Sequence, residues 1–333
     1  MIANLLSYGW WVAAILIVVG FVALVKGADW LVDGASAIAK RFGISDLIIG
    51  LTVVAFGTSM PEFVVNMISV AEGSTDLAIT NILGSNIINT FVILGLTALV
   101  YPVVSQKRSR DFDIPMSIIA GVLVFAAVAV QSPFGEEGRG ISRMGGIMLL
   151  ILFCYFLYNT FRHAKEHPDD VQSDDVPSTK EITVRRAIAL MLGGLVGLVV
   201  GGELIVKSAV DLALRCGVSE AVIGLTIVAL GTSLPELATS VMAAFKHNCD
   251  IALGNVIGSN IFNVFFVLAT SATVRPLPAY DGIETDAWMA ALGSILVWLM
   301  LKTNKERELK RWGGAVLLIV YGGYLTYRLM SIG

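Results

Sequence analysis

One thirteen-residue motif occurs twice in this chain, and it constrains the fold more than any other feature. It reads GLTVVAFGTSMPE over residues 50–62 and GLTIVALGTSLPE over residues 224–236, so Gly50 corresponds to Gly224. Each copy places a glutamate, two hydroxyl side chains and a proline inside an apolar run long enough to cross a bilayer. A charged side chain at the centre of a spanning helix costs roughly 2.5–3.5 kcal/mol. We therefore expect Glu62 and Glu236 to be functional and to meet at one cation site inside the membrane.

The composition indicates a polytopic, all-α membrane protein. Hydrophobic residues make up 56% of the chain and charged residues only 15%, whereas soluble domains carry about 25% charged residues. The net charge of −3 and the lack of a basic stripe argue against a nucleic-acid partner. Cys154, Cys216 and Cys249 are widely separated, so we expect free thiols. The first apolar run follows an uncharged start and lacks a small-residue cleavage site, so we expect a retained helix.

We expect ten membrane-spanning helices, because a span requires about 20 mostly apolar residues. Lys and Arg gather in every second connection between them, and the positive-inside rule makes those connections cytoplasmic. Both termini then lie outside, the loop 162–185 is cytoplasmic, and the expected location is a prokaryotic inner membrane. The expected spans are 9–38, 45–71, 77–101, 113–131, 142–161, 186–212, 219–245, 251–274, 284–301 and 312–330.

The repeat extends well beyond the motif and divides the chain into two halves. Asn81 and the Gly84-Ser85-Asn86 triplet recur as Asn255 and Gly258-Ser259-Asn260, with the same offset along the chain as the two motif copies. Five spans per half is an odd number, so the second half enters the membrane from the opposite side. Such inverted repeats place a binding site near the midplane, where the halves meet. The expected units are a five-helix repeat over 1–161, a cytosolic linker over 162–185, and an inverted five-helix repeat over 186–333.

The linker carries several aspartates between residues 169 and 175 and shows no periodic pattern. A calcium-sensing regulatory loop is one interpretation. A solvated connection between the two halves is the other, and this composition favours it.

The motif chemistry favours a hard cation. Ser45 and Ser219 each precede an acid and an apolar run, which predicts the start of the second and seventh helices. Thr58 and Ser59 precede Glu62 by four and three residues, so their side chains share its face of the helix, and Thr232, Ser233 and Glu236 repeat the pattern. Pro61 and Pro235 lack an N–H, so each predicts a kink and a carbonyl without its helical donor. Carboxylate, hydroxyl and carbonyl oxygens suit Ca²⁺. The histidines, which transition metals prefer, all fall in expected connections.

Polar residues on four other helices have more than one interpretation. Asn86 and Asn260, on the third and eighth helices, are weighed evenly between interhelical hydrogen bonding and ion ligation. On the first and sixth helices, Asp29 and Asp33 with Lys26 nearby, and Glu203, Lys207 and Asp211, have spacings that favour structural pairing. Gly193, Gly197 and Gly201 form a ridge that predicts close packing or a sliding surface.

At these residues the sequence resembles the calcium/cation antiporter superfamily, which contains the sodium/calcium exchangers. The resemblance covers essentially the whole chain and rests on the Gly-Thr-Ser-Met/Leu-Pro-Glu cores and the Gly-Ser-Asn triplets. It implies that the first and sixth helices slide across the core to alternate access. The ion ligands that it implies are Glu62, Thr58, Ser59, Ser85, Asn89 and the Ala55 carbonyl, with Glu236, Thr232, Ser233, Ser259, Asn263 and the Ala229 carbonyl in the second half.

One departure bears on the transported ions. Sodium/calcium exchangers often carry an aspartate at the position of Asn263, whereas this chain has asparagine in both copies, at Asn89 and Asn263. Two carboxylates are therefore evident at the centre, which leaves the coupling ion and the stoichiometry open.

The leading hypothesis is a secondary antiporter that exchanges Ca²⁺ for Na⁺, carries no organic cofactor and acts as a monomeric unit in the bilayer. A proton-coupled exchanger is the nearest alternative, because burial favours the protonated form of a carboxyl group. A cation channel is more remote, since channels are usually symmetric oligomers around a filter. An intramembrane enzyme is disfavoured, because hydroxyls and carbonyls surround each carboxylate, so we expect no enzyme activity.

Overall fold

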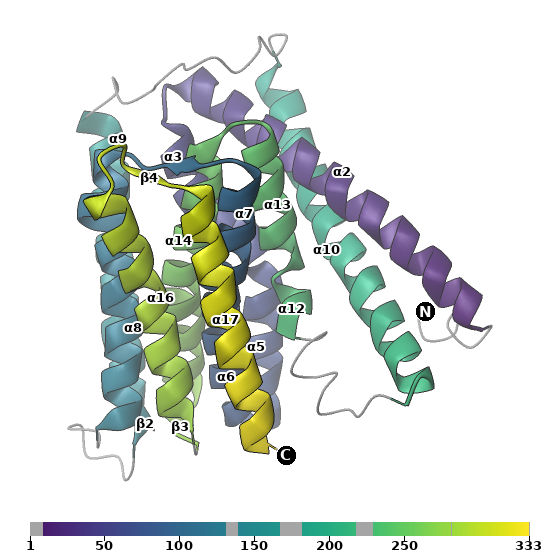
Figure 1. The fold of residues 1–333 in the computed structure, drawn as a ribbon. Coiled ribbons are helices and arrows are strands. Elements are labelled where there is room, and N and C mark those ends of the chain that lie inside the picture. The colour runs from purple at the N-terminus through teal and green to yellow at the C-terminus, as the bar shows by residue number, and fades with distance from the viewer. Residues whose placement is uncertain (1–8, 131–138, 167–181, 218–228, 281, 333) are drawn as a thin grey trace.

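The computed structural model describes residues 9–130, 139–166, 182–217, 229–280 and 282–332, which form a bundle of helices (Figure 1). Within these residues, seven helices are long and apolar enough to cross a membrane, and a bent helix pair makes an eighth candidate. Helices also occupy the other two expected ranges, through α13 (Leu234–Phe245) and α17 (Arg311–Ile332). The chain is thus an integral membrane protein, and the count of ten spans stays a prediction.

The first motif copy lies in a broken helix. Its parts are α3 (Asp46–Ile49), the π-helical segment η1 (Gly50–Val54), α4 (Ala55–Thr58) and α5 (Met60–Glu72). Ser45 caps the start as predicted, because its Oγ accepts a hydrogen bond from the Ile48 N–H at 3.4 Å. The helix bends by 44° at Ser59, whose backbone angles are φ −85° and ψ 7°. Pro61 therefore falls in the first turn of α5, where its missing N–H leaves no helical bond unmade.

The second copy repeats this break. Ser233 separates α12 (Ala229–Thr232) from α13, and its angles of φ −87° and ψ 5° nearly match those of Ser59. Pro235 falls in the first turn of α13, as Pro61 does in α5. The earlier part of this copy, including the expected cap at Ser219, lies outside the described residues.

Two helices form the centre of the bundle. The first runs through α6 (Thr75–Ile87), η2 (Ile88–Ile93) and α7 (Leu94–Val100), and the second through α14 (Cys249–Phe262), η6 (Asn263–Leu268) and α15 (Ala269–Val274). In the second helix, 94% of the most apolar 18-residue stretch is buried, against 28% of the corresponding stretch in α2 (Trp10–Phe42). The π-helical segments begin beside Asn89 and at Asn263, and such segments are frequent at functional sites.

Four further helices flank this centre, and two short antiparallel ladders join their ends. Val103–Val104 (β1) pairs with Glu308–Leu309 (β4), and Gly140–Ile141 (β2) pairs with Leu277–Pro278 (β3). Figure 1 places β4 at the upper end of the bundle and β2 and β3 at the lower end. The flanking helices are α8 (Ile114–Ala129, preceded by the π-helical segment η3, Ser109–Asp113), α9 (Arg143–Glu166), α16 (Ile283–Thr303) and α17.

The two longest helices, α2 and α10 (Val184–Arg215), pack on each other at an angle to the rest, and their lower ends diverge from the bundle (Figure 1). Their contact is made by glycines. A Cβ at Gly27 would lie 2.7 Å from the Gly194 carbonyl oxygen, and one at Gly20 would lie 2.8 Å from that of Gly201. The predicted close packing is therefore present, and two of the three expected glycines take part in it. A Cβ at Gly197 would lie 3.2 Å from Gly27 Cα, and one at Gly201 would lie 2.7 Å from the Gly20 carbonyl oxygen, whereas Gly194 takes the place of Gly193. A Cβ at Gly193 would meet the Trp30 ring only at 3.7 Å.

Candidate functional site

The two motif copies meet in the interior of the bundle. Glu62 and Glu236 are both 0% exposed, each in the first turn of the helix that follows the break. The Ser59 hydroxyl donates a hydrogen bond of 2.8 Å to Glu236 Oε1, so a side chain of the first copy contacts the carboxylate of the second. The two carboxylates are close enough to interact electrostatically. The sequence expectation that both lie at one place is consistent with this contact.

Glu62 has a different environment from Glu236. Neither oxygen of the Glu62 carboxylate has a hydrogen-bond partner among the described residues, whereas only Oε2 of Glu236 lacks one. The Ser85 and Thr232 hydroxyls lie within interaction range of Glu62 but form no hydrogen bond with it. A buried carboxylate without donors is unfavourable unless a cation or proton compensates it.

Most of the other predicted ligands also carry oxygens without a hydrogen-bond partner in the described part of the chain, and Ser85, Thr232 and Ser259 lie within interaction range of a glutamate. The hydroxyls of Ser85, Ser233 and Ser259 are buried, and the half-buried Thr232 adds another; within the described ranges none forms a hydrogen bond. Both polar atoms of Asn89 and the Oδ1 of Asn263 are likewise buried and unpaired there. Native proteins pair nearly all buried polar groups, so a cluster of unpaired oxygens calls for an explanation such as an ion. The donor set is all oxygen apart from amide nitrogens, which fits Ca²⁺ and Na⁺.

Besides Ser59, two further predicted ligands have partners. Thr58 Oγ1 donates to Asn255 Oδ1 at 3.1 Å and contacts the Ala55 carbonyl oxygen at 3.4 Å. That carbonyl also accepts the Ser59 N–H at 3.0 Å. Ala229, whose carbonyl is the counterpart of the Ala55 carbonyl in the second half, is the first residue of α12.

Asn86 and Asn260 form hydrogen bonds between helices from the two halves. Asn86 Nδ2 donates to the Asn260 carbonyl at 3.1 Å, and Asn260 Nδ2 donates to Thr90 Oγ1 at 2.7 Å. Asn263 Nδ2 donates to Asn86 Oδ1 at 3.0 Å. The structural interpretation of Asn86 is thus realised, while Asn260 retains an unpaired Oδ1 among the described residues.

Asn255 is a site residue to which the sequence analysis assigned no role. It accepts the Thr58 hydrogen bond, and its Nδ2 donates to the Glu236 carbonyl at 3.3 Å and to Ser240 Oγ at 2.9 Å. Its counterpart in the first half, Asn81, donates to Asn66 Oδ1 at 2.7 Å. The recurrence of asparagine at positions 81 and 255 indicates that the residue matters in both halves, but it does not reveal which helix each side chain contacts.

The charged residues of α2 and α10 pair only partly as expected. Glu203 and Lys207 form an ion pair within α10, as their spacing predicted. Asp29 and Asp33 instead contact Lys246, which follows α13, at 2.7 and 2.6 Å. The expectation that Lys26 is their neighbour missed this contact, because helical spacing carries no information about a residue on another element.

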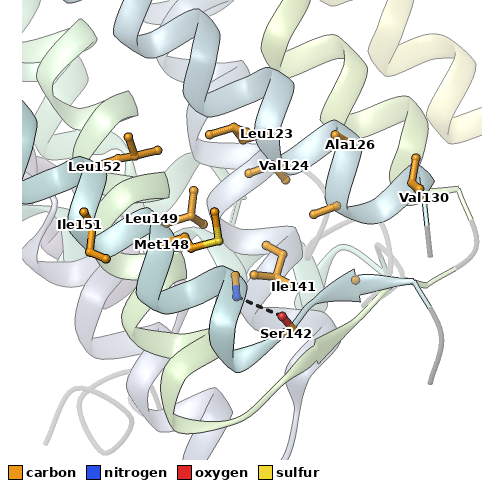
Figure 2. A pocket seen from close by; sticks show the side chains of 13 residues that line it. Leu123, Val124, Ala126, Val130, Ile141, Ser142, Met148, Leu149, Ile151 and Leu152 are labelled. Atoms are coloured by element: carbon orange, nitrogen blue, oxygen red, sulfur yellow. Dashed lines mark hydrogen bonds between the residues drawn. The ribbon is translucent and has the colours of Figure 1, made fainter. Parts of the chain in front are cut away.

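An apolar pocket of about 580 Å³ lies away from these carboxylates, between α8 and α9 (Figure 2). Ser142 is its one hydroxyl, and the Oγ accepts the Gly145 N–H at 3.0 Å. The lining therefore presents no ligand set for a cation. The cysteines are free thiols as predicted, with Cys154 and Cys216 exposed and Cys249 half-buried.

The comparison with known families agrees with this geometry. The sequence profile of the family described as "Sodium/calcium exchanger protein" matches residues 12–162 and 186–330. The chain belongs to this family. The two matched segments leave out residues 163–185, which nearly coincide with the predicted linker.

Individual relatives match over almost their full length. The putative antiporter CaxA of Alkalimonas amylolytica is 38% identical, covering 96% of this chain and 99% of CaxA. The sodium/calcium exchanger MaX1 of Methanosarcina acetivorans is 31% identical, covering 94% and 97%. A solved structure of the sodium-calcium exchanger NCX_Mj, soaked with Na⁺ and Sr²⁺, superimposes with a TM-score of 0.79 at 31% identity and covers 94% of this chain and 97% of that one. The chain is accordingly a membrane antiporter of cations.

Proposed function

We propose that this protein is a secondary antiporter that exchanges Ca²⁺ for Na⁺ by alternating access at a site between Glu62 and Glu236. The observation that carries the proposal is the Ser59–Glu236 contact, which joins the two motif copies in a region rich in unpaired oxygens. The names of MaX1 and NCX_Mj, both sodium/calcium exchangers, support the choice of ions.

The ligand set follows from the geometry and the resemblance together. Glu62 and Glu236 supply two negative charges, which one Ca²⁺ or two Na⁺ would neutralise. Oxygens without a partner in the described structure, on Ser85, Ser233, Ser259, Thr232, Asn89 and Asn263, surround the charges as neutral ligands. Ser59 orients Glu236, and Thr58 and the Ala55 and Ala229 carbonyls complete the set. Competition explains exchange, because two uncompensated carboxylates are unfavourable in the apolar interior and either cargo compensates them.

Inverted repeats account for the paired contacts of the fold. The offset that relates the two motif copies also relates Gly20 to Gly194 and Gly27 to Gly201. The repeat counterpart of the Gly20–Gly201 contact is therefore a contact between Gly194 and Gly27, and the structure contains both. The two β-ladders at opposite ends of the bundle likewise support two halves of opposite orientation (Figure 1).

The membrane topology completes the proposal. Ten spans in an inner membrane place both termini outside and residues 162–185 in the cytoplasm, in agreement with the loop charges. The first residues of α2 and the last of α17 both lie toward the lower end of Figure 1, which supports an even number of spans. Because one chain supplies both carboxylates, the proposed transport unit is a monomer. The proposal includes no enzymatic activity and no organic cofactor.

Ion flux in proteoliposomes tests the proposal. An outward-directed Na⁺ gradient should drive Ca²⁺ uptake into the vesicles, and Glu62→Gln should reduce this uptake by about 100-fold or more. If only a proton gradient drives Ca²⁺ movement, the protein is instead a proton-coupled exchanger, which the two carboxylates and two asparagines also permit. Uptake that continues with no exchangeable ion on the opposite side would indicate a channel.

A further inference from the structure

A cluster of three charges joins the α2–α10 pair to the rest of the bundle at one end. Lys246 Nζ lies 2.7 Å from Asp29 Oδ1 and 2.6 Å from Asp33 Oδ1, and it also donates to the Asp29 carbonyl at 3.0 Å. Both aspartates lie on α2, whereas Lys246 ends α13. We call Asp29, Asp33 and Lys246 the first triad. It ties the long helix to the core by opposite charges.

Hydrogen bonds of Asn248 reinforce the same junction. Asn248 Nδ2 donates to Ser36 Oγ on α2 at 3.1 Å and to Asp46 Oδ2 on α3 at 2.6 Å. Its Oδ1 accepts the Ile251 N–H and caps α14. The junction is therefore built from several elements rather than from one surface ion pair.

The repeat places a second triad at the opposite end of the molecule. The offset between the two halves takes Asp29 to Glu203 and Asp33 to Lys207, and it takes Lys246 to Glu72. Each triad thus contains one lysine and two carboxylates, but the lysine belongs to the core in the first triad and to the long helix in the second. We call Glu203, Lys207 and Glu72 the second triad. Its charges allow Lys207 to bridge both glutamates, as Lys246 bridges both aspartates.

In this structure the second triad is open. Lys207 Nζ contacts Glu203 Oε1 of its own helix at 2.5 Å, and both side chains are about half exposed. Glu72, at the end of α5, is exposed and forms no ion pair within the described part of the chain. In Figure 1 the lower part of α10 lies away from the bundle that contains α5. The first triad, in contrast, is closed by the contacts of Lys246 with Asp29 and Asp33.

We propose that the two triads are alternating latches, of which only one is closed at a time. Closure of the first holds α2 and α10 against the core at the end where α9 ends and α10 begins, so that the site opens toward the other end. In the second state the pair tilts back, Lys246 releases Asp29 and Asp33, and Lys207 engages Glu72. This inference rests on the proposed alternating-access function and names residues that stabilise its two states. Inverted repeats permit such an exchange, because each half adopts the other's arrangement.

One further cation lies near Glu72. A Cβ at Gly73 would be 2.8 Å from Arg275 Nη1, so this arginine approaches the same turn. Lys207 would join or replace it in the second state. A test must therefore measure the approach of α10 itself rather than the charge state of Glu72.

Cysteine cross-linking measures that approach directly. In a background with the three native cysteines replaced by serine, Glu72→Cys with Lys207→Cys is treated in membranes with a short, reducible bis-thiol reagent. Asp33→Cys with Lys246→Cys serves as the matched pair for the closed latch. We expect both pairs to cross-link, each in a fraction of molecules, and each cross-link to block flux until it is reduced. Cross-linking of the 33/246 pair alone, in protein that still exchanges cations, would overturn the proposal.

Charge removal tests the reciprocity. Lys246→Ala should speed cross-linking of the 72/207 pair about threefold to tenfold, and Glu72→Ala should do the same for the 33/246 pair, since partly exposed ion pairs contribute modestly. Lys26→Ala, an exposed lysine on α2 outside the triad, should change neither rate. Equal effects of Lys26→Ala and Lys246→Ala would contradict the latch. If wild-type protein exchanges no cations but both pairs cross-link reciprocally, the latch stands and the proposed function fails.

Discussion

The two copies of the motif have nearly the same backbone but different hydrogen bonds. The breaks at Ser59 and Ser233 agree within a few degrees, and both glutamates are fully buried. Yet Ser59 donates to Glu236, while Ser233 donates to nothing described, and Glu62 has no donor there. Duplication therefore provides two similar scaffolds, and their different partners leave one carboxylate with a described hydrogen-bond donor and the other without one.

The largest expected effect tests whether both carboxylates are needed. Glu62→Gln and Glu236→Gln should each reduce Na⁺-driven Ca²⁺ flux by about 100-fold or more, because removing one charge from a buried site costs roughly 3 kcal/mol or more of ion binding. Glu62→Gln should also leave the ion-free protein at least as stable as wild type, because it removes an uncompensated buried charge and breaks no described hydrogen bond. Flux assays with purified protein give the answer. Near-normal flux in either variant would contradict a shared site.

Substitution of Asn255 and of its counterpart Asn81 compares the two halves through their hydrogen bonds. Asn255→Ala removes three hydrogen bonds, including the link from Thr58 to the second copy, whereas Asn81→Ala removes one described bond. At about 1 kcal/mol each, we expect a loss of about 3 kcal/mol of stability against about 1 kcal/mol. Denaturant unfolding in detergent measures both. Equal losses of stability would mean that the Thr58–Asn255 hydrogen bond adds no measurable stability.

Adding a third carboxylate separates the two halves again. Asn89→Asp removes no described hydrogen bond but adds a buried charge, so it should raise Ca²⁺ affinity and lower ion-free stability less than Asn263→Asp does. Asn263→Asp would direct a carboxylate oxygen at Asn86 Oδ1 in place of an N–H donor. We expect it to lower stability by about 1–3 kcal/mol unless Ca²⁺ is bound. Thermal unfolding with and without Ca²⁺ distinguishes these outcomes, and identical behaviour of the two variants would argue against the asymmetry.

The smallest expected effect concerns the serines. Ser59→Ala should lower the stability of the ion-free protein by about 1–2 kcal/mol, because Glu236 loses its donor. Ser233→Ala should leave the ion-free protein nearly unchanged, since its hydroxyl has no described partner. Both should weaken stabilisation by added Ca²⁺. A drop in ion-free stability for Ser233→Ala alone would mean that Ser233, and not Ser59, forms the stabilising hydrogen bond in the ion-free protein.

The positions of Glu62 and Glu236 inside the bundle and the helix breaks beside them could be predicted, because their signals are local. Glutamates and hydroxyls three and four residues apart share a helix face, and prolines mark the breaks. The position of the break itself was refined, since Ser59 and Ser233 lie just before the prolines. The role of Asn255 and the partner of Asp29 were missed, because each depends on a side chain from a distant segment.

The sequence alone determined that two similar halves each carry a carboxylate into a membrane, since a repeat and its hydropathy are properties of the chain. Only the tertiary structure decided that Ser59 serves Glu236, that Lys246 holds α2, and that its counterpart Glu72 stands apart from Lys207. Periodicity specifies the face on which a residue lies. Packing between helices far apart in the sequence selects its partner, and that selection makes two like halves unlike.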